Sequence, residues 1–282
     1  MPGFSQDKFL LRAPSLGENA LLLVRQPQED ELFGGEVLNL EKIVSPGDKD
    51  WPTVSETPSL PDIPVGKRLV CVRLPWSRSD LINGVESLGF RFVELTMRPE
   101  INLSTESNIG LERPPKIKVL LKEVSKSRVD AVAERAASLF SLTRWHRDPN
   151  LGPELAARRL ARWVCDSVNH ESKVLIEALD AGSMQPLGFF LIRRDESGAS
   201  FWELTAIYRE FQGRGLALPV WQEFLRFELD CGTSYVSTNF NAVNLGLYSL
   251  YRDAGFSLGE PSVALHQVLA KPKYGDEGSA PS

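Results

Sequence analysis

The chain has 282 residues, of which 42% are hydrophobic and 24% charged, with a formal net charge of −5 and a pI near 5.4. This balance is that of a globular protein with a sizeable core, and it argues against a general nucleic-acid binder, which would present a basic face. Three widely spaced cysteines predict neither a disulfide framework nor a metal site, and the lack of a long apolar run or a leader predicts a cytoplasmic protein without a membrane partner.

The first hundred residues predict a small α/β domain. Its elements, in chain order, are a strand-like stretch at 20–24, a turn into a strand at 32–37, a proline-rich surface loop at 45–66, a strand at 69–74, a helix from Ser79 or Asp80 to Leu88 and a strand at 90–94. We expect this N-terminal domain to cover residues 1–101. A polar linker over 102–115 follows it and ends in two prolines.

From residue 116 onward, strands and helices follow each other in a longer pattern. Its elements are a strand at 116–124, a helix at 130–140, a loop at 141–150, a helix at 153–168, strands at 174–179, 187–192 and 201–208, a helix at 218–229, a short strand ending at 239, a last helix and a last strand. The pattern predicts an α/β domain with a mixed (α+β) sheet over 116–270. A polar tail over 271–282 follows.

A glycine-rich turn separates the strand at 201–208 from the helix that follows it. The turn reads Gln212-Gly213-Arg214-Gly215-Leu216-Ala217. Such a turn presents unpaired backbone N–H groups at the positive end of a helix, which suits a phosphate, and glycine lets the backbone approach it closely. It is neither a Walker P-loop nor a dinucleotide fingerprint, because Gly-Lys-Ser/Thr and GxGxxG are both absent. The sequence therefore predicts a phosphate-binding site of another kind.

This turn resembles the Gln/Arg-x-x-Gly-x-Gly/Ala signature of the GCN5-related N-acetyltransferases (GNAT). A second stretch, NLGLYSLYRDAGF from Asn244 onward, resembles the N-x-x-A-x-x-L-Y-x-x-x-G-F pattern of the same family, with Leu247 in place of the usual alanine. The resemblance covers residues 116–269. It implies the GNAT acyltransferase fold, preceded here by a smaller α/β domain, with acetyl-CoA as co-substrate and a primary amine as acceptor.

The smaller domain itself resembles part of the larger one. The stretch VESLGFRFVE near residue 90 repeats the helix–Gly–Phe–strand layout of YRDAGFSLGE near residue 255. No Q-x-x-G-x-G/A motif occurs before residue 100. We therefore expect a degenerate GNAT half without a phosphate turn, the alternative being that this layout is common in unrelated proteins.

The resemblance implies roles for two candidate catalytic residues. Tyr251 lies at the family's general-acid position, where a phenol with a pKa of about 10 can protonate the departing thiolate; the alternative is a packing role, as expected for Tyr248. Glu203 is the candidate base, the alternatives being a solvated glutamate on the strand or His146 as the base. The residues implied to hold acetyl-CoA are Ile207, through its backbone, the turn residues Gln212, Gly213, Arg214, Gly215, Leu216 and Ala217, and Asn244, which either binds the cofactor or orients the last helix.

The loop after the first helix of the larger domain is expected to border the acceptor pocket with Trp145, His146, Arg147 and Asp148. An indole beside mixed charges suits a sugar ring or a nucleobase, although Trp145 could also serve only to anchor the loop. This loop, the RLARWV stretch and VRLPWSRSDLINGVESLGFRFVE more loosely resemble the TDP-fucosamine (nucleotide amino sugar) acetyltransferase-like group.

The expected function is therefore transfer of an acetyl group to a small amine, with a nucleotide-linked amino sugar as the first candidate. Two alternatives stay open. The acceptor could be a protein, peptide or antibiotic amine, or the chain could be a non-catalytic acyl-CoA-binding module. The oligomeric state is also open, a homodimer included.

Overall fold

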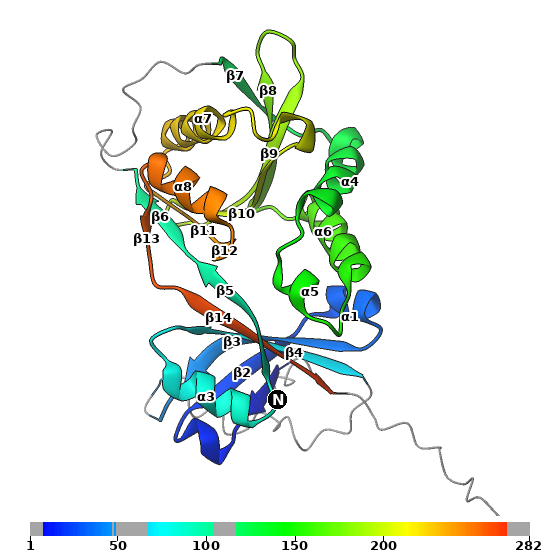
Figure 1. Ribbon diagram of the computed structural model, residues 1–282, viewed down its shortest axis with the longest axis vertical. Coiled ribbons are helices and arrows are strands. Elements are labelled where there is room, and N and C mark those ends of the chain that lie inside the picture. Colours follow the sequence, from blue (N-terminus) through cyan, green and yellow to red (C-terminus); the bar gives the residue numbers. More distant parts are fainter. Residues whose placement is uncertain (1–7, 47, 49–66, 104–116, 270–282) are drawn as a thin grey trace, which may run out of the picture. The chain divides into compact units, whose positions relative to one another are not determined.

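The computed structural model describes residues 8–46, 48, 67–103 and 117–269 (Figure 1). The chain forms two compact units, unit 1 with residues 1–93 and 263–282, and unit 2 with residues 94–262. The boundaries of these units differ from the predicted ones. The strand at 99–102, near the end of the predicted N-terminal domain, lies in unit 2, and nearly all of the last strand, at 262–269, lies in unit 1. The predicted tail and most of the predicted linker lie outside the described residues.

Unit 1 is built on a sheet with the strand order β1-β2-β3-β4-β14. Its elements are β1 (Lys8–Leu11), η1 (Pro14–Leu16), β2 (Ala20–Arg25), α1 (Pro27–Phe33), β3 (Glu36–Val44), β4 (Arg68–Pro75), α3 (Ser79–Ser87), the start of β5 (Arg91–Met97) and β14 (Ser262–Leu269). The predicted strand at 69–74, the helix after it and the strand at 90–94 are confirmed. Pairing is antiparallel between β1, β2 and β3 but parallel between β3 and β4.

Unit 2 is built on a sheet with the order β13-β6-β11-β10-β9-β8-β7. Its elements are β6 (Pro99–Asn102), β7 (Val119–Glu123), η4 (Lys126–Arg128), α4 (Val129–Leu139), α5 (Arg144–Arg147), α6 (Pro153–Ser167), β8 (Lys173–Asp180), β9 (Pro186–Arg194), β10 (Ala199–Ile207), η5 (Arg209–Phe211), α7 (Ala217–Asp230), β11 (Tyr235–Thr238), β12 (Phe240–Asn241), α8 (Leu245–Asp253) and β13 (Ser257–Leu258). The pair β10–β11 is parallel, whereas the pairs β7–β8, β8–β9 and β9–β10 are antiparallel. The predicted mixed sheet is confirmed.

Helices cover both faces of the sheet of unit 2, with α7 and α8 on one face and α4 and α6 on the other (Figure 1). Neighbouring residues of a strand point to opposite faces, so Phe190 packs with α7 and α8 while Phe189 packs with α4 and α6. Phe190 stacks on Phe224 of α7 with ring centroids 3.8 Å apart. Burying one such side chain contributes about 1.5–3 kcal/mol, so the packing on both faces stabilises the sheet between its two helix layers.

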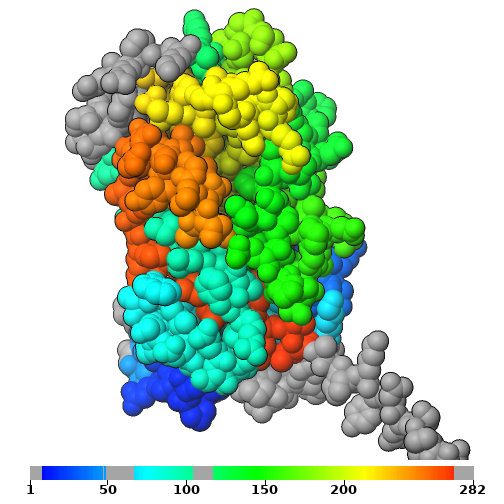
Figure 2. Space-filling view, in the orientation of Figure 1, coloured from blue at the N-terminus to red at the C-terminus, as the bar shows by residue number. Residues whose placement is uncertain are grey.

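The surfaces of α7 and α8 lie next to each other in the space-filling view (Figure 2). These two helices follow the glycine turn and β12 respectively, so the two sequence signatures come together on the same face of the sheet. Within the described ranges, no helix is long and apolar enough to cross a membrane.

Candidate functional site

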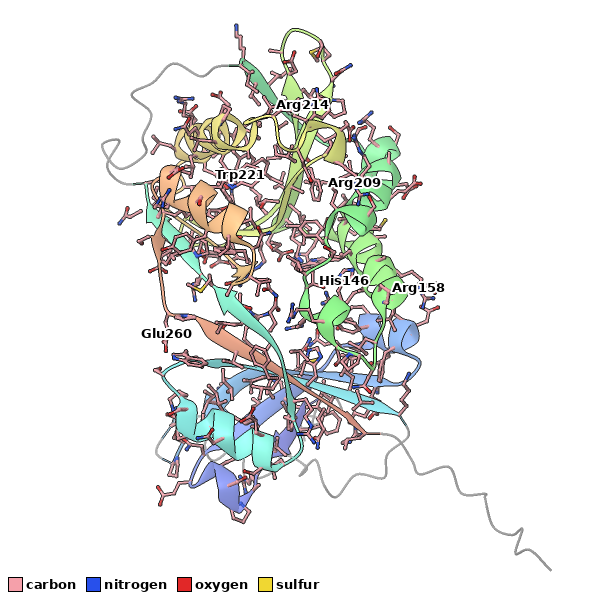
Figure 3. The ribbon with its side chains drawn as sticks, viewed as in Figure 1. His146, Arg158, Arg209, Arg214, Trp221 and Glu260 are labelled. Carbon is pink, nitrogen blue, oxygen red and sulfur yellow. The ribbon has the colours of Figure 1, made fainter. Side chains whose placement is uncertain are left out.

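The glycine turn (residues 212–217) lies at the N-terminus of α7 and is exposed from Gln212 to Gly215. Gly213 and Gly215 have φ values of 74° and 72°, which glycine adopts without steric cost. Among the described residues, no acceptor takes the backbone N–H groups of residues 213–217. Figure 3 labels Arg214, whose guanidinium lies 5.5 Å from the ring centre of Phe211. Free amides, a helix N-terminus and a cation together make an anion-binding surface.

The first residue of the turn joins it to the end of β10. The side-chain amide of Gln212 donates a hydrogen bond to the backbone oxygen of Ile207 at 2.8 Å. This bond fixes the path by which the chain leaves the strand and enters the turn. This contact explains why the motif has a glutamine at position 212.

β10 is paired on both sides over only part of its length. It pairs with β11 at residues 199–202 but with β9 as far as Ile207, so its residues 203–207 have no described partner on the β11 side. We call this side the open edge of β10. Because the N–H of Tyr208 donates to Leu187 of β9, the alternation of an antiparallel ladder turns the backbone groups of Thr205 and Ile207 toward the open edge. Such an edge suits an extended ligand that carries amides.

The hydroxyl of Tyr251 lies beside this open edge. Tyr251 is 1% exposed, and its oxygen is 3.3 Å from the hydroxyl oxygen of Thr205. Its ring stacks on Phe240 with centroids 5.6 Å apart and also packs against Phe256 and Trp221. Burial raises the pKa of Tyr251, which keeps the hydroxyl protonated at neutral pH. The phenol is thus a buried, protonated group held next to Thr205 of β10, and its role as proton donor stays a prediction.

Asn244 caps α8. Its side-chain oxygen accepts a hydrogen bond from the backbone N–H of Leu247 at 3.2 Å. An N-cap of this kind satisfies one of the free amides of the first helical turn and so helps hold Tyr251 in place. Of the two predicted roles for Asn244, orientation of the helix has a visible contact, and the contact with the cofactor stays a prediction.

Glu203 lies at a register shift between β9 and β10, located between Trp202 and Leu204. Its carboxylate accepts hydrogen bonds from Trp163 at 3.0 Å, Lys173 at 2.8 Å and Arg193 at 3.3 Å. Trp163 belongs to α6, so this group faces the helix layer opposite α8. These contacts are those of a polar cluster that joins α6 to the sheet. Its role as base stays a prediction.

The loop around α5 holds the residues predicted to contact the acceptor. Trp145 is 1% exposed, and the guanidinium of Arg159 lies 4.7 Å from its ring centre and 5.3 Å from that of Trp163. Asp148 is buried and accepts two hydrogen bonds from Asn150, each at 2.9 Å. Trp145 thus stacks on α6 and Asp148 closes a turn.

His146 is the partly exposed member of this group, and Figure 3 labels it. Its Nδ1 lies 2.8 Å from the hydroxyl of Thr143, and burial lowers the pKa of His146, so the imidazole is neutral at neutral pH. Asn241 of β12 donates to the backbone oxygen of Leu142 at 2.8 Å, which ties this loop to the strand next to Phe240. That these loop residues border an acceptor pocket stays a prediction.

Sequence reasoning did not single out Thr205, Thr238 or Trp221, which surround the hydroxyl of Tyr251. Thr205 lies two residues before Ile207 and therefore on the same side of the strand. The predicted contact of Ile207 with the cofactor could thus have pointed to Thr205 as well. The sequence gives no such signal for Trp221, because a tryptophan on the apolar face of a helix is expected to be a core residue.

No family model matches the chain, and no curated protein is similar to it in sequence. Solved structures are similar in fold. A GCN5-related N-acetyltransferase from Sphaerobacter thermophilus matches with a TM-score of 0.55 at 15% identity, over 89% of this chain and 80% of that one. A tandem GNAT protein from the clavulanic acid biosynthesis pathway matches with a TM-score of 0.51 at 11% identity, over 89% and 78%.

A third neighbour is the GCN5-related glucosamine N-acetyltransferase region of a fungal multi-domain GH3 β-N-acetylglucosaminidase. It matches with a TM-score of 0.56 at 10% identity, over 88% of this chain and 31% of that one. At such identities the likeness establishes the fold. The chain has the mixed α/β fold of the GCN5-related N-acetyltransferases with a second half, as predicted.

Proposed function

We propose that the protein is an acetyl-CoA-dependent N-acetyltransferase that acts on the primary amine of a small molecule. The observation that carries the proposal is the hydroxyl of Tyr251, 3.3 Å from Thr205 at the open edge of β10. The glycine turn lies just beyond the end of the same strand and is tied to Ile207 by Gln212. An anion site, an edge for amides and a proton donor thus follow one another along the strand, in the order of the groups of an acyl-CoA.

Each of these parts has a task in acyl transfer. The free N–H groups of residues 213–217, with Arg214, bind the pyrophosphate of acetyl-CoA. The backbone groups of Thr205 and the backbone N–H of Ile207 pair with the amides of its pantetheine arm. Tyr251 gives its hydroxyl proton to the sulfur as the C–S bond of the thioester breaks and the C–N bond of the product amide forms.

The amine must lose a proton before or during its attack, and two side chains are candidates for accepting it. Glu203 is a carboxylate already held by three donors. His146 is partly exposed, and burial lowers its pKa, so its neutral form is ready to accept a proton. These observations favour His146 over Glu203, with water able to relay the proton in either case.

The acceptor we propose is an amino sugar, carried on a nucleotide, that contacts the α5 loop through Trp145, His146 and Asp148. The hydrogen bond between Asn241 and the backbone oxygen of Leu142 supports this placement of the acceptor. It joins the α5 loop to the residue after Phe240, and Phe240 stacks on Tyr251. One structural neighbour is described as a glucosamine N-acetyltransferase region. That description concerns the other protein, but it makes amino sugars the first acceptors to test.

The test is incubation of the full chain with acetyl-CoA and a panel of amines, with thiol release and product mass as readouts. The panel includes aminodeoxy-sugar nucleotides, free amino sugars, polyamines, peptides and aminoglycosides. We expect acetylation of at least one amino sugar. Acetylation of peptides or polyamines alone would replace the acceptor class, calorimetric binding of acetyl-CoA without any product would favour a binding module, and no binding would overturn the proposal.

A further inference from the structure

Trp221 of α7 carries a buried polar group without a partner. The side chain is 1% exposed, and within the described part of the chain its indole N–H makes no hydrogen bond. The buried indole N–H of Trp145 in the α5 loop likewise has no partner there, whereas those of Trp163 and Trp202 each donate to a carboxylate at 3.0 Å. Folded proteins leave few buried donors unpaired, so an unpaired donor beside a candidate site calls for an explanation.

The unpaired N–H lies next to the proton donor of the proposed reaction. The rings of Trp221 and Tyr251 meet edge to face, with centroids 6.5 Å apart and an interplanar angle of 72°. Thr205 approaches the Tyr251 hydroxyl from the strand at 3.3 Å. Burial raises the pKa of Tyr251, and the nearby side chains of Thr205, Trp221 and Thr238 oppose this rise with smaller, lowering effects. Figure 3 labels Trp221 on α7, the helix that begins at the glycine turn.

The groups that face the hydroxyl carry no charge in the described structure. They are Thr205 from β10, Thr238 from β11 and Trp221 from α7, while Phe240 of β12 and Phe256 after α8 pack on the ring itself. Hydrogen-bond donors are therefore the means by which this site can stabilise a phenolate. An indole is a donor only, so it can interact with the phenol oxygen in one way.

We propose that Trp221 is a positioning residue for proton transfer, whose indole N–H donates to the oxygen of Tyr251 and turns the phenolic proton toward the open edge of β10. This inference rests on the proposed function. As the O–H bond of Tyr251 breaks and the S–H bond of coenzyme A forms, the negative charge passes from sulfur to the phenol oxygen. Trp221 stabilises that charge until solvent returns a proton to Tyr251.

The test removes the N–H while keeping the shape of the ring. Benzothienylalanine at position 221 replaces the indole N–H by sulfur, and Trp221→Phe is the simpler variant. We expect kcat to fall about tenfold, the usual net worth of one hydrogen bond, with acetyl-CoA affinity unchanged. Because the lost donor stabilised the phenolate, the pKa of Tyr251 rises, and the alkaline limb of the pH profile of kcat moves to higher pH.

The matched control is the same change made in a Tyr251→Phe background, where it should have no further effect on kcat. An equal fall in both backgrounds, or an alkaline limb that does not move, would assign Trp221 to packing alone. A readout free of activity keeps this inference separate from the proposed function. Fluorotyrosine at position 251, titrated by fluorine NMR, should show a higher pKa once the indole N–H is gone, and an unchanged pKa would overturn the inference even in an inactive protein.

Discussion

The two units share a series of four strands and a later helix, with other elements inserted between them, but the residues of the proposed reaction occur in one unit. In unit 1 the order is β1, β2, β3, β4 and α3, and in unit 2 it is β8, β9, β10, β11 and α8. Both series are antiparallel up to the third strand and parallel between the third and fourth. Both also show a register shift between the second and third strands. The helix–Gly–Phe repeat seen in the sequence therefore belongs to a longer structural repeat.

The last helix of each series ends in the same way. Gly89 and Gly255 have φ values of 91° and 92°. The N–H of Phe90 donates to the oxygen of Val85 at 3.2 Å, and that of Phe256 donates to Tyr251 at 2.9 Å. Val85 is thus the counterpart of Tyr251, and it has no proton to give.

Among the described residues, a strand with one-sided pairing occurs in both units. β3 pairs with β4 at residues 36–39 but with β2 as far as Val44, which repeats the one-sided pairing of β10. The segment between β3 and β4, where unit 2 has its glycine turn, lies mostly outside the described residues, and its sequence has no Q-x-x-G-x-G/A. The open edge thus comes with the fold, whereas the proposed catalysis depends on a few residues added to it.

The largest effect should come from making unit 2 resemble unit 1 at the proton donor. Tyr251→Phe keeps the ring against Phe240 and removes only the hydroxyl. Turnover should fall about 10²–10⁴-fold, the usual worth of general acid catalysis, with little change in acetyl-CoA affinity. Val85→Ala is the control, because it alters the counterpart position and should leave turnover per folded molecule unchanged. Near-normal turnover of Tyr251→Phe, where chemistry limits the rate, would move the proton donor elsewhere.

A smaller effect should follow from disrupting the glycine turn, whose motif is absent from the sequence of unit 1. Gly215→Val puts a branched side chain at a φ of 72°, where it is strained. The turn must shift its N–H groups to relieve this strain, at a cost of roughly 1–2 kcal/mol, so affinity for coenzyme A should fall about five- to thirtyfold by calorimetry.

Gly232→Val is the matched control for the turn. Gly232 lies at the other end of α7 with a φ of 82°, and like Gly215 it has no atom within 4 Å of an added Cβ. Both variants carry similar strain, but affinity should change only in Gly215→Val. Equal affinities in the two variants would remove the phosphate site from the turn.

Much of this fold could be predicted from local pattern. The helices expected at 130–140, 153–168 and 218–229 are α4, α6 and α7 within a residue or two at each end, because apolar spacing, Pro153 and the glycine turn define them. Pairing between distant strands could not be predicted. The alternation of residues 262–269 predicts a strand, but it does not say which sheet the strand joins, and that sheet is in unit 1.

Short elements and single contacts were also beyond the sequence. α1 was not predicted, although Pro27 at its first turn and Gly34 at its end, with a φ of 70°, are start and stop signals. The register shift next to Glu203 decides which face its carboxylate takes, and a shift of one residue leaves no mark in the sequence. Thr205 and Tyr251 are 46 positions apart, so their contact required the fold.

The smallest effect concerns the helices that carry Tyr251 and Val85. α8 has a side-chain cap from Asn244, whereas α3 has none at its N-cap residue, Arg78. Asn244→Ala should lower the free energy of unfolding by about 1 kcal/mol, and Asn244→Gly by only a few tenths, because glycine tolerates the N-cap conformation. Denaturant unfolding measures both, and Asn244→Asp, which keeps the acceptor oxygen, should stay near the wild type. If Asn244 instead binds the cofactor, Asn244→Ala and Asn244→Gly would lose acetyl-CoA affinity equally, whatever their stability. If Asn244 is only a cap, acetyl-CoA affinity should instead follow the stability of the first turn of α8. Asn244→Ala should then lose more affinity than Asn244→Gly.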